Sequence, residues 1–154
     1  MKISLVCVGK LKEPWLKAAV EMYAKRISKF AEVEIVETND FKDTLPLELI
    51  LQKEAEEVLK RLPSSAFAVL CDLHGHEYDS LNLAQKMQIW MEMSGAHLYF
   101  LIGGSNGVSE ILRKKAAVKL KLSALTFPHQ LTRVILLEQI YRSFKIQNGE
   151  SYHK

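Results

Sequence analysis

Apolar, strand-like runs alternate with amphipathic helical stretches along the whole chain of 154 residues. Runs with the length and composition of β-strands occur at 2–8, 33–38, 66–72, 97–102 and 119–123. Helical periodicity occupies 13–30, 47–62, 81–95, 110–118 and 129–147. Strands that alternate with helices predict right-handed crossovers between parallel neighbours. We therefore expect an α/β fold, with a mostly parallel sheet and helices on both of its faces.

Three predicted loops follow strands, at 72–80, 103–109 and 124–128. Ligands of such sheets bind beyond the carboxyl ends of the strands, where these loops lie. The second loop contains "IGGSNG", which matches neither a Walker loop nor the dinucleotide fingerprint. The third, "ALTFP", has few side chains suited to phosphate but offers backbone donors and acceptors that suit adenine. The pair favours an adenosine ligand such as S-adenosylmethionine; another small metabolite and a ligand-free turn are the alternatives.

Other chemistries have less support in the residues. His74 and His76 flank Gly75, and this glycine predicts a turn rather than an extended metal-binding segment, so no metal is expected. Cys7 and Cys71 lie in apolar runs and are predicted to be core thiols in a reducing cytoplasm. The apolar run near the start is too short to span a membrane and lacks a signal-peptide cleavage region, so no membrane partner is expected.

Charge is distributed unevenly along the chain. Residues 1–105 carry 12 Lys and Arg against 15 Asp and Glu, a net charge of −3, whereas residues 106–154 carry 9 against 3, a net charge of +6. A basic C-terminal third is typical of proteins that bind a polyanion such as RNA. A solvated charged face is the alternative.

The last thirty residues carry the most specific motifs. They contain "TFPHQ", an Arg-Val pair, the pattern E-Q-x-Y-R-x-F-K-I and a closing G-E-x-Y-H-K. Together with "VGKLKE" and "IGGSNG" earlier in the chain, these motifs resemble the ribosomal RNA large-subunit methyltransferase H family of SPOUT methyltransferases. The similarity spans the whole chain and is weakest at 39–45.

The resemblance implies one SPOUT methyltransferase domain over 1–154, a trefoil knot in its C-terminal part and a homodimer. It implies transfer of a methyl group from S-adenosylmethionine to the position-three ring nitrogen of a pseudouridine in 23S rRNA, within the assembled ribosome. Two other classes remain as alternatives: a non-enzymatic ribosome- or RNA-binding factor, and a nicotinamide-dependent oxidoreductase. The missing dinucleotide fingerprint argues against the oxidoreductase.

Carried over by position, the resemblance assigns cofactor binding to the same three loops that the sheet rule selects. The residues are Leu73, Gly104, Ser123, Ala124, Leu125, Thr126, Phe127 and Pro128. It also assigns catalysis to Arg142, Tyr152 and His153. In this hypothesis Arg142 stabilises negative charge on the target base, Tyr152 stacks on it or bonds to it, and His153 orients it or accepts its proton.

The final helix and the tail that follows support further predictions. Glu138 and Arg142 are four residues apart and can pair on the helix surface. Gly149 is expected to let the chain turn so that the tail folds back, onto the site of its own chain or of a partner. Neutral His129 is expected at the helix start, in a structural role. Arg133 and Lys145 are predicted to face RNA, and the apolar core face is predicted to contain Leu131, Val134, Ile135 and Phe144, with Ile140 and Tyr141 beside them.

Overall fold

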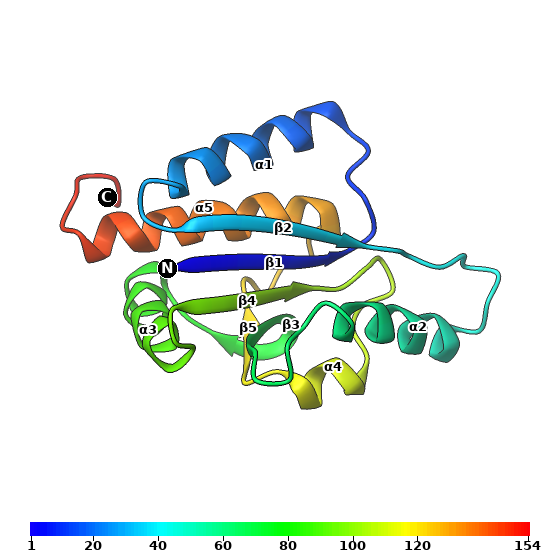
Figure 1. Ribbon diagram of the computed structural model, residues 1–154. Coiled ribbons are helices and arrows are strands. Elements are labelled where there is room, and N and C mark those ends of the chain that lie inside the picture. Colours follow the sequence, from blue (N-terminus) through cyan, green and yellow to red (C-terminus); the bar gives the residue numbers. More distant parts are fainter.

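A computed structural model describes residues 1–154 and contains one five-stranded sheet, in the order β2-β1-β4-β3-β5, with every pair parallel. Figure 1 shows this sheet with its flanking helices. The strands are β1 (Lys2–Val8), β2 (Glu32–Thr38), β3 (Phe67–Glu77), β4 (His97–Ile102) and β5 (Val118–Lys121). The helices are α1 (Pro14–Ile27), α2 (Leu47–Leu59), α3 (Ser80–Met93), α4 (Glu110–Lys115) and α5 (His129–Gln147). The predicted fold class is confirmed.

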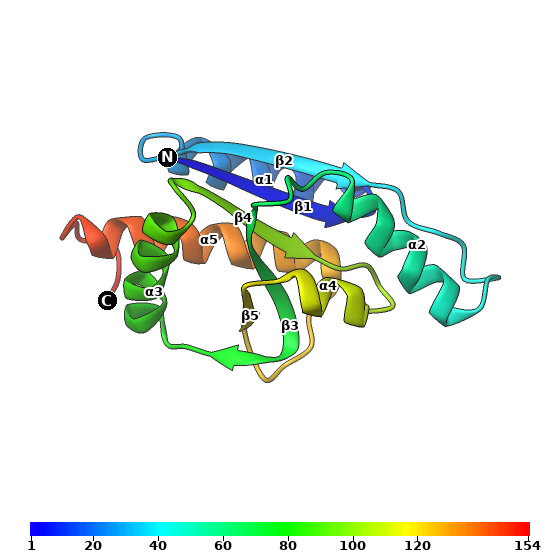
Figure 2. The same cartoon turned by 60° about the horizontal axis from the view of Figure 1, so that its bottom comes forward.

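Helices cover both faces of the sheet, as Figures 1 and 2 show together. The odd-numbered residues of β1, such as Ile3 and Leu5, join a core with α1, α3 and α5. Its even-numbered residues Val6 and Val8 join a second core with α2 and α4. Successive strand residues point to opposite faces, so one apolar run supplies both layers. No helix is both long enough and apolar enough to cross a bilayer.

The third strand is longer than predicted. The sequence predicted a strand at 66–72 and a loop from 73, whereas β3 runs to Glu77. The pairing with β5 shifts between Cys71 and His76, which both lie opposite Leu120, so β3 bulges and then pairs again. The predicted turn at Gly75 is therefore wrong. A Cβ there would lie 2.6 Å from the backbone carbonyl of Lys119 on β5. Glycine therefore allows the backbones of β3 and β5 to approach closely at this point.

Replacing Gly75 with alanine should therefore destabilise the protein by about 2 kcal/mol, because backbone atoms cannot move aside as a side chain can. Urea denaturation would measure the loss. His74→Ala, at an exposed position of the same strand, is the matched control and should change stability by less than about 0.5 kcal/mol. Equal stability of Gly75→Ala and the wild type would show that the backbones of β3 and β5 do not approach so closely at Gly75.

Helix α5 buries only part of its predicted core face. Phe144 and Ile140 are at most 4% exposed, as predicted, whereas the predicted Leu131, Val134 and Ile135 are only partly buried. Leu136 and Leu137, which the prediction did not include, are fully buried in their place. The helix contacts α1, α3 and β4 at once. Apolar residues consequently occur around most of its circumference, and no single stripe marks its core side.

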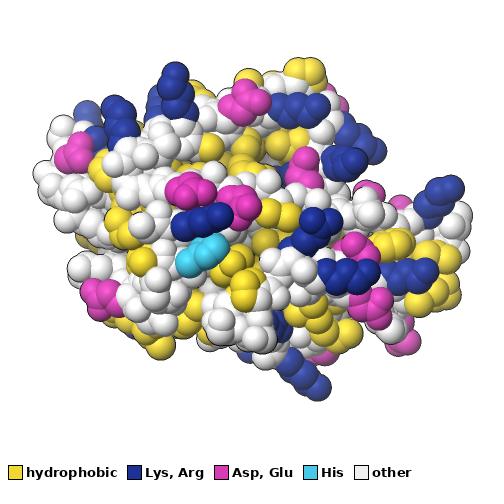
Figure 3. Space-filling model, viewed as in Figure 1, with side chains coloured by type: hydrophobic (Ala, Val, Ile, Leu, Met, Phe, Trp, Pro, Cys, Tyr) yellow, Lys and Arg dark blue, Asp and Glu magenta, His cyan; other side chains and the backbone are white.

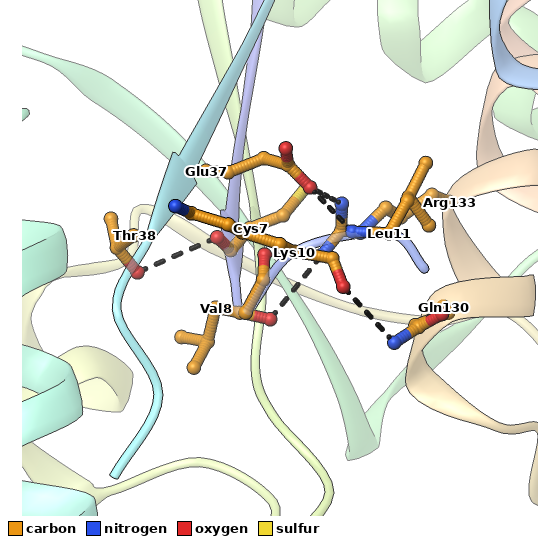
Figure 4. Close-up of polar contacts among 9 residues, drawn as sticks. Cys7, Val8, Lys10, Leu11, Glu37, Thr38, Gln130 and Arg133 are labelled. Carbon is orange, nitrogen blue, oxygen red and sulfur yellow. Dashed lines mark hydrogen bonds and ion pairs between the residues drawn. The ribbon is translucent and has the colours of Figure 1, made fainter. Parts of the chain in front are cut away.

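Arg133 is fully buried in this interface, so the prediction that it faces RNA is wrong. Its guanidinium donates to the Glu37 carboxylate at 2.6 Å and to the carbonyl oxygens of Gly9 and Val8 at 2.8 and 3.3 Å. Figure 4 shows these contacts at the ends of β1 and β2. Arg133 thus fastens α5 to the carboxyl edge of the sheet, where the functional loops begin.

Candidate cofactor and catalytic site

The three loops selected by the sequence surround one cavity of about 870 Å³. Its walls come from the bulge of β3, the glycine loop after β4 and the segment between β5 and α5. The cavity therefore lies at the carboxyl ends of three parallel strands, where such sheets bind ligands. Its volume falls within the range of about 300–1,000 Å³ that is usual for small-molecule sites.

Every residue assigned to the cofactor lines this cavity except Ala124, which lies in the same segment. The lining residues from that set are Leu73, Gly104, Ser123, Leu125, Thr126, Phe127 and Pro128. The loops thus converge as expected, and the cofactor assignment of these residues stays a prediction. Residues that the sequence reasoning did not select, among them Arg113 and Thr132, line the cavity too.

The segment from Ser123 to Phe127 leaves its backbone polar groups available. It takes part in no backbone–backbone hydrogen bond, and its one internal bond joins the Leu125 N–H to the Ser123 hydroxyl at 3.0 Å. The N–H and C=O groups of Ala124, Thr126 and Phe127 have no partner in the chain. Backbone groups left free beside a cavity can pair with the edge of a base such as adenine. This fits an adenosyl ligand held without a phosphate cradle.

The loop after β4 can adopt its shape only because glycine, which has no side chain, occupies Gly103 and Gly107. A Cβ on Gly103 would lie 2.6 Å from the carbonyl oxygen of Gly107, within a turn closed by a bridge between Gly104 and Gly107. Gly107 itself has a φ of 90°, which disfavours any other residue. The loop is therefore built tightly, with its backbone exposed to the cavity.

Asp72 and Arg113 form a buried ion pair beside the cavity. The Asp72 carboxylate accepts from Arg113 Nε at 2.8 Å and from the His74 N–H at 3.0 Å, with 2% of its side chain exposed. Burial raises the pKa of Asp72, but the hydrogen bonds from Arg113 and His74 outweigh it and leave the pKa below its ordinary value. The pair joins α4 to the bulge of β3 and so shapes the wall that contains Leu73.

Asp72→Asn should lower stability by about 2 kcal/mol at neutral pH, the size of a hydrogen bond to a charged group. Since the pKa of Asp72 is depressed in the folded protein, its contribution is present above the ordinary value of 3.8 and disappears as pH falls below it. The difference between wild type and variant in urea midpoint should thus shrink in acid. Glu110→Gln removes the exposed partner of the same arginine and should cost less than about 1 kcal/mol. A larger loss in Glu110→Gln would contradict this ranking.

Two further titratable groups of the cavity, His129 and Cys71, have pKa values shifted towards their uncharged forms. Burial lowers the pKa of His129 and nearby Arg133 lowers it further, which agrees with the neutral histidine expected there. Burial raises the pKa of the Cys71 and Cys7 thiols to about 12. Neither thiol is an activated nucleophile, in agreement with the sequence prediction.

The three residues predicted to be catalytic form one cluster around Glu138. Arg142 donates to Glu138 Oε1 from Nη2 at 2.6 Å, the predicted helical pair, and the Tyr152 hydroxyl donates to the same oxygen at 3.1 Å. The Arg142 guanidinium lies over the Tyr152 ring at 4.8 Å and donates to His153 Nδ1 at 3.2 Å. Gly149, with a φ of 65°, makes the predicted turn. The tail is thus packed onto α5.

The cluster borders a second cavity of about 500 Å³. His153 lines it together with Ile135 and Gln139 of α5, and it shares Leu120, Leu122 and Phe127 with the first cavity. Within one chain, neither Tyr152 nor His153 lines the first cavity. The two cavities therefore flank the β5–α5 segment, with the cofactor loops on one side and the tail on the other.

Much of the basic excess of the C-terminal third is paired internally. Arg113, Arg133, Arg142 and Lys145 each form an ion pair with a carboxylate. The face that carries α2 and α4 shows basic and acidic side chains intermixed, without a continuous basic patch (Figure 3). Lys121, which lines the second cavity, forms none of the ion pairs and remains available to a polyanion.

Known proteins agree with this architecture over the full chain. A family model described as a predicted SPOUT methyltransferase matches residues 1–153. Ribosomal RNA large subunit methyltransferase H from Ruminiclostridium cellulolyticum is 46% identical, and the match covers 100% of both chains. The protein of the same name from Bifidobacterium animalis is also 46% identical, again over 100% of both chains. A solved structure of a probable methyltransferase from Bordetella pertussis has the same fold, with a TM-score of 0.53 at 13% identity, covering 92% of this chain and 95% of its own. The chain belongs to the ribosomal RNA large-subunit methyltransferase H family of SPOUT methyltransferases.

Proposed function

We propose that this protein is a homodimeric enzyme that uses S-adenosylmethionine to methylate the position-three ring nitrogen of a pseudouridine in 23S rRNA, acting in the cytoplasm on the assembled ribosome. The observation that carries the proposal is the meeting of the three strand-end loops around one cavity, with free backbone groups along 123–127. Relatives of the whole chain are named ribosomal RNA methyltransferases, which supports an rRNA substrate.

The cavity supplies what an adenosyl ligand needs. Thr126 and Phe127 would meet the adenine edge with their backbone groups, and the exposed backbone of Gly104 would let the rest of the ligand approach closely. When bound, S-adenosylmethionine supplies an electrophilic methyl group on its sulfonium. The main task of the chain is then to hold the nucleophilic nitrogen in line with that methyl group.

The cluster around Glu138 suits the nucleobase. Methylation requires loss of the proton on the ring nitrogen, which a water molecule held at the site would accept. Its loss leaves negative charge on the base, and Arg142 is a permanent cation that would stabilise this charge. A guanidinium has only donors, so His153 Nδ1 must accept from Arg142, and the neutral ring carries its proton on Nε2. That N–H can donate to a carbonyl of the base, an orienting role. Tyr152 can stack on the base or hydrogen-bond to it.

The separation of the two cavities supports a dimeric site. In one chain the tail lines the second cavity only, whereas Leu73 and Leu125, at the first cavity, are 52% and 69% exposed. Large exposed apolar side chains beside a polar site are typical of a surface that a partner covers. In the proposed dimer, the tail of one chain lies beside the cofactor cavity of the other, where it meets the nucleobase and leaves the cofactor contacts to the three loops.

A transfer assay with tritiated S-adenosylmethionine tests the function. Ribosomes from cells that lack the protein should accept label on a single pseudouridine of 23S rRNA, and mass spectrometry should locate the methyl group on its position-three nitrogen. Protein-free 23S rRNA is the control and should accept none. Binding to ribosomes without transfer would favour a non-enzymatic factor, and calorimetric binding of NAD in place of S-adenosylmethionine would favour an oxidoreductase.

A further inference from the structure

Glu54 is a buried carboxyl outside the cofactor cavity and the Glu138 cluster. It lies on α2 and is 5% exposed, and its Oε1 is buried without any hydrogen-bond partner. None of the ion pairs in the structure includes it. Leaving a buried polar atom unpaired is costly, and natural proteins rarely keep one without a use.

The carboxyl lies directly behind the glycine loop. Its Oε2 is 2.8 Å from the point that a Cβ on Gly104 would occupy, and Val8 Cγ1 is 3.1 Å from the same point. Gly104 lines the cofactor cavity, whereas Glu54 does not. Only the backbone of this glycine therefore separates the carboxyl from the cavity wall, and a side chain at 104 would push the two apart.

The charges that face Glu54 are acidic. Burial raises the pKa of Glu54, and the negative charges of Asp40 and Asp43, from the segment between β2 and α2, raise it further, to about 7. Asp43 also accepts a hydrogen bond from Asn106 of the glycine loop at 3.2 Å, so the acidic segment is attached to that loop. From α5, His129 lies near Asp40, and burial lowers the pKa of this histidine. The wall behind the glycine loop is thus acidic, and the arginine that lines the cavity, Arg113, is paired with Asp72.

We propose that Glu54 is the counter-charge for the cationic cofactor, acting across Gly104, and that it gives up a proton when the cofactor binds. S-adenosylmethionine carries a sulfonium and an ammonium against one carboxylate, and a positive charge close to Glu54 stabilises its ionised form. Asp40 and Asp43 add to the same negative potential. The assignment rests on the proposed cofactor and makes Glu54 a positioning residue rather than a catalytic one.

The sign of the linkage follows from the charges. In the free protein Glu54 is largely protonated at pH 6 and largely ionised at pH 8, since its pKa is about 7. A bound cation lowers that pKa, so binding releases protons below pH 7, and affinity rises with pH before levelling off. If the pKa falls by about one unit, affinity rises about tenfold in total, and about half a proton leaves per site at pH 6.5.

Calorimetry of S-adenosylmethionine binding, in buffers of different ionisation enthalpy, counts these protons directly. In wild-type protein, Glu54 should contribute about half a proton to the release at pH 6.5. Glu54→Gln keeps the size of the side chain but has no such proton, so it should release about half a proton less than the wild type. Ligand and His129 protons are common to both proteins and cancel in the difference. Asp43→Asn removes an exposed charge and should move the proton release to lower pH.

Equal proton release by wild type and Glu54→Gln would overturn the assignment, as would an Asp43→Asn profile that does not move. Thermal denaturation of each variant shows whether it is folded. If Glu54→Gln does not fold, Asp43→Asn still tests the proposal, because Asp43 is exposed and its substitution should not disturb the fold. Absence of binding in all proteins at every pH would instead refute the proposed function and the assignment with it.

Discussion

Removing Tyr152, His153 and Lys154 should lower methyl transfer to ribosomes by at least about 100-fold, the loss that a small misplacement of the reacting groups can cause, while the affinity for S-adenosylmethionine stays the same. The reason is that the tail forms the cluster with Arg142 and Glu138 but lines no part of the first cavity within its own chain. Single-turnover transfer of tritium and calorimetry with the cofactor measure the two quantities separately.

The chain offers a matched control for this deletion. Lys154 alone makes no ion pair or hydrogen bond in the structure, so deleting only this residue should leave transfer unchanged. His153→Gln should retain part of the activity, because an amide can still donate to a carbonyl of the base. Full transfer by the three-residue deletion would remove the tail from the mechanism.

Arg133→Met should cost about 3–5 kcal/mol of stability, the loss expected when one partner of a buried ion pair is removed. Its guanidinium is fully buried and bonds to Glu37 and to the carbonyl oxygens of Val8 and Gly9. Methionine removes all of these donors, and Glu37 keeps only the N–H of Leu11. Chemical denaturation would measure the loss through the urea midpoint.

Lys145 is the matched control on the same helix. It pairs with Glu150 near the end of α5, and Lys145→Met should cost less than about 1 kcal/mol because that pair is partly exposed. If Arg133→Met instead kept the stability of the wild type and weakened ribosome binding, the arginine would face RNA as the sequence first suggested.

The sheet could be predicted because each strand and helix is recognised from the pattern of apolar residues within its own short segment. The course of β3 past Asp72 could not be predicted in that way, since it depends on pairing with β5, a strand formed more than 40 residues later. Gly75 shows the difficulty: glycine permits a turn and a close crossing of backbones equally well, and only the neighbouring Lys119 decides between them.

The candidate site was predictable where a general rule applied. Leu73, Gly104 and the segment from Ser123 to Pro128 follow strand ends, so the sheet rule and the family resemblance select the same loops. The burial of Arg133 was not predictable, because its acceptors come from β1 and β2, some 96 to 125 positions away in the sequence. Glu54 carries no motif, and its closeness to Gly104 appears only in the fold.

Amide NMR of the isotope-labelled protein can locate the bound cofactor residue by residue. Titration with S-adenosylmethionine should shift the backbone amides of Leu73, Gly104, Thr126 and Phe127, which surround the first cavity, and leave those of α1 and β2 unchanged. Shifts confined to other parts of the chain, or no shifts at saturating cofactor, would contradict the account.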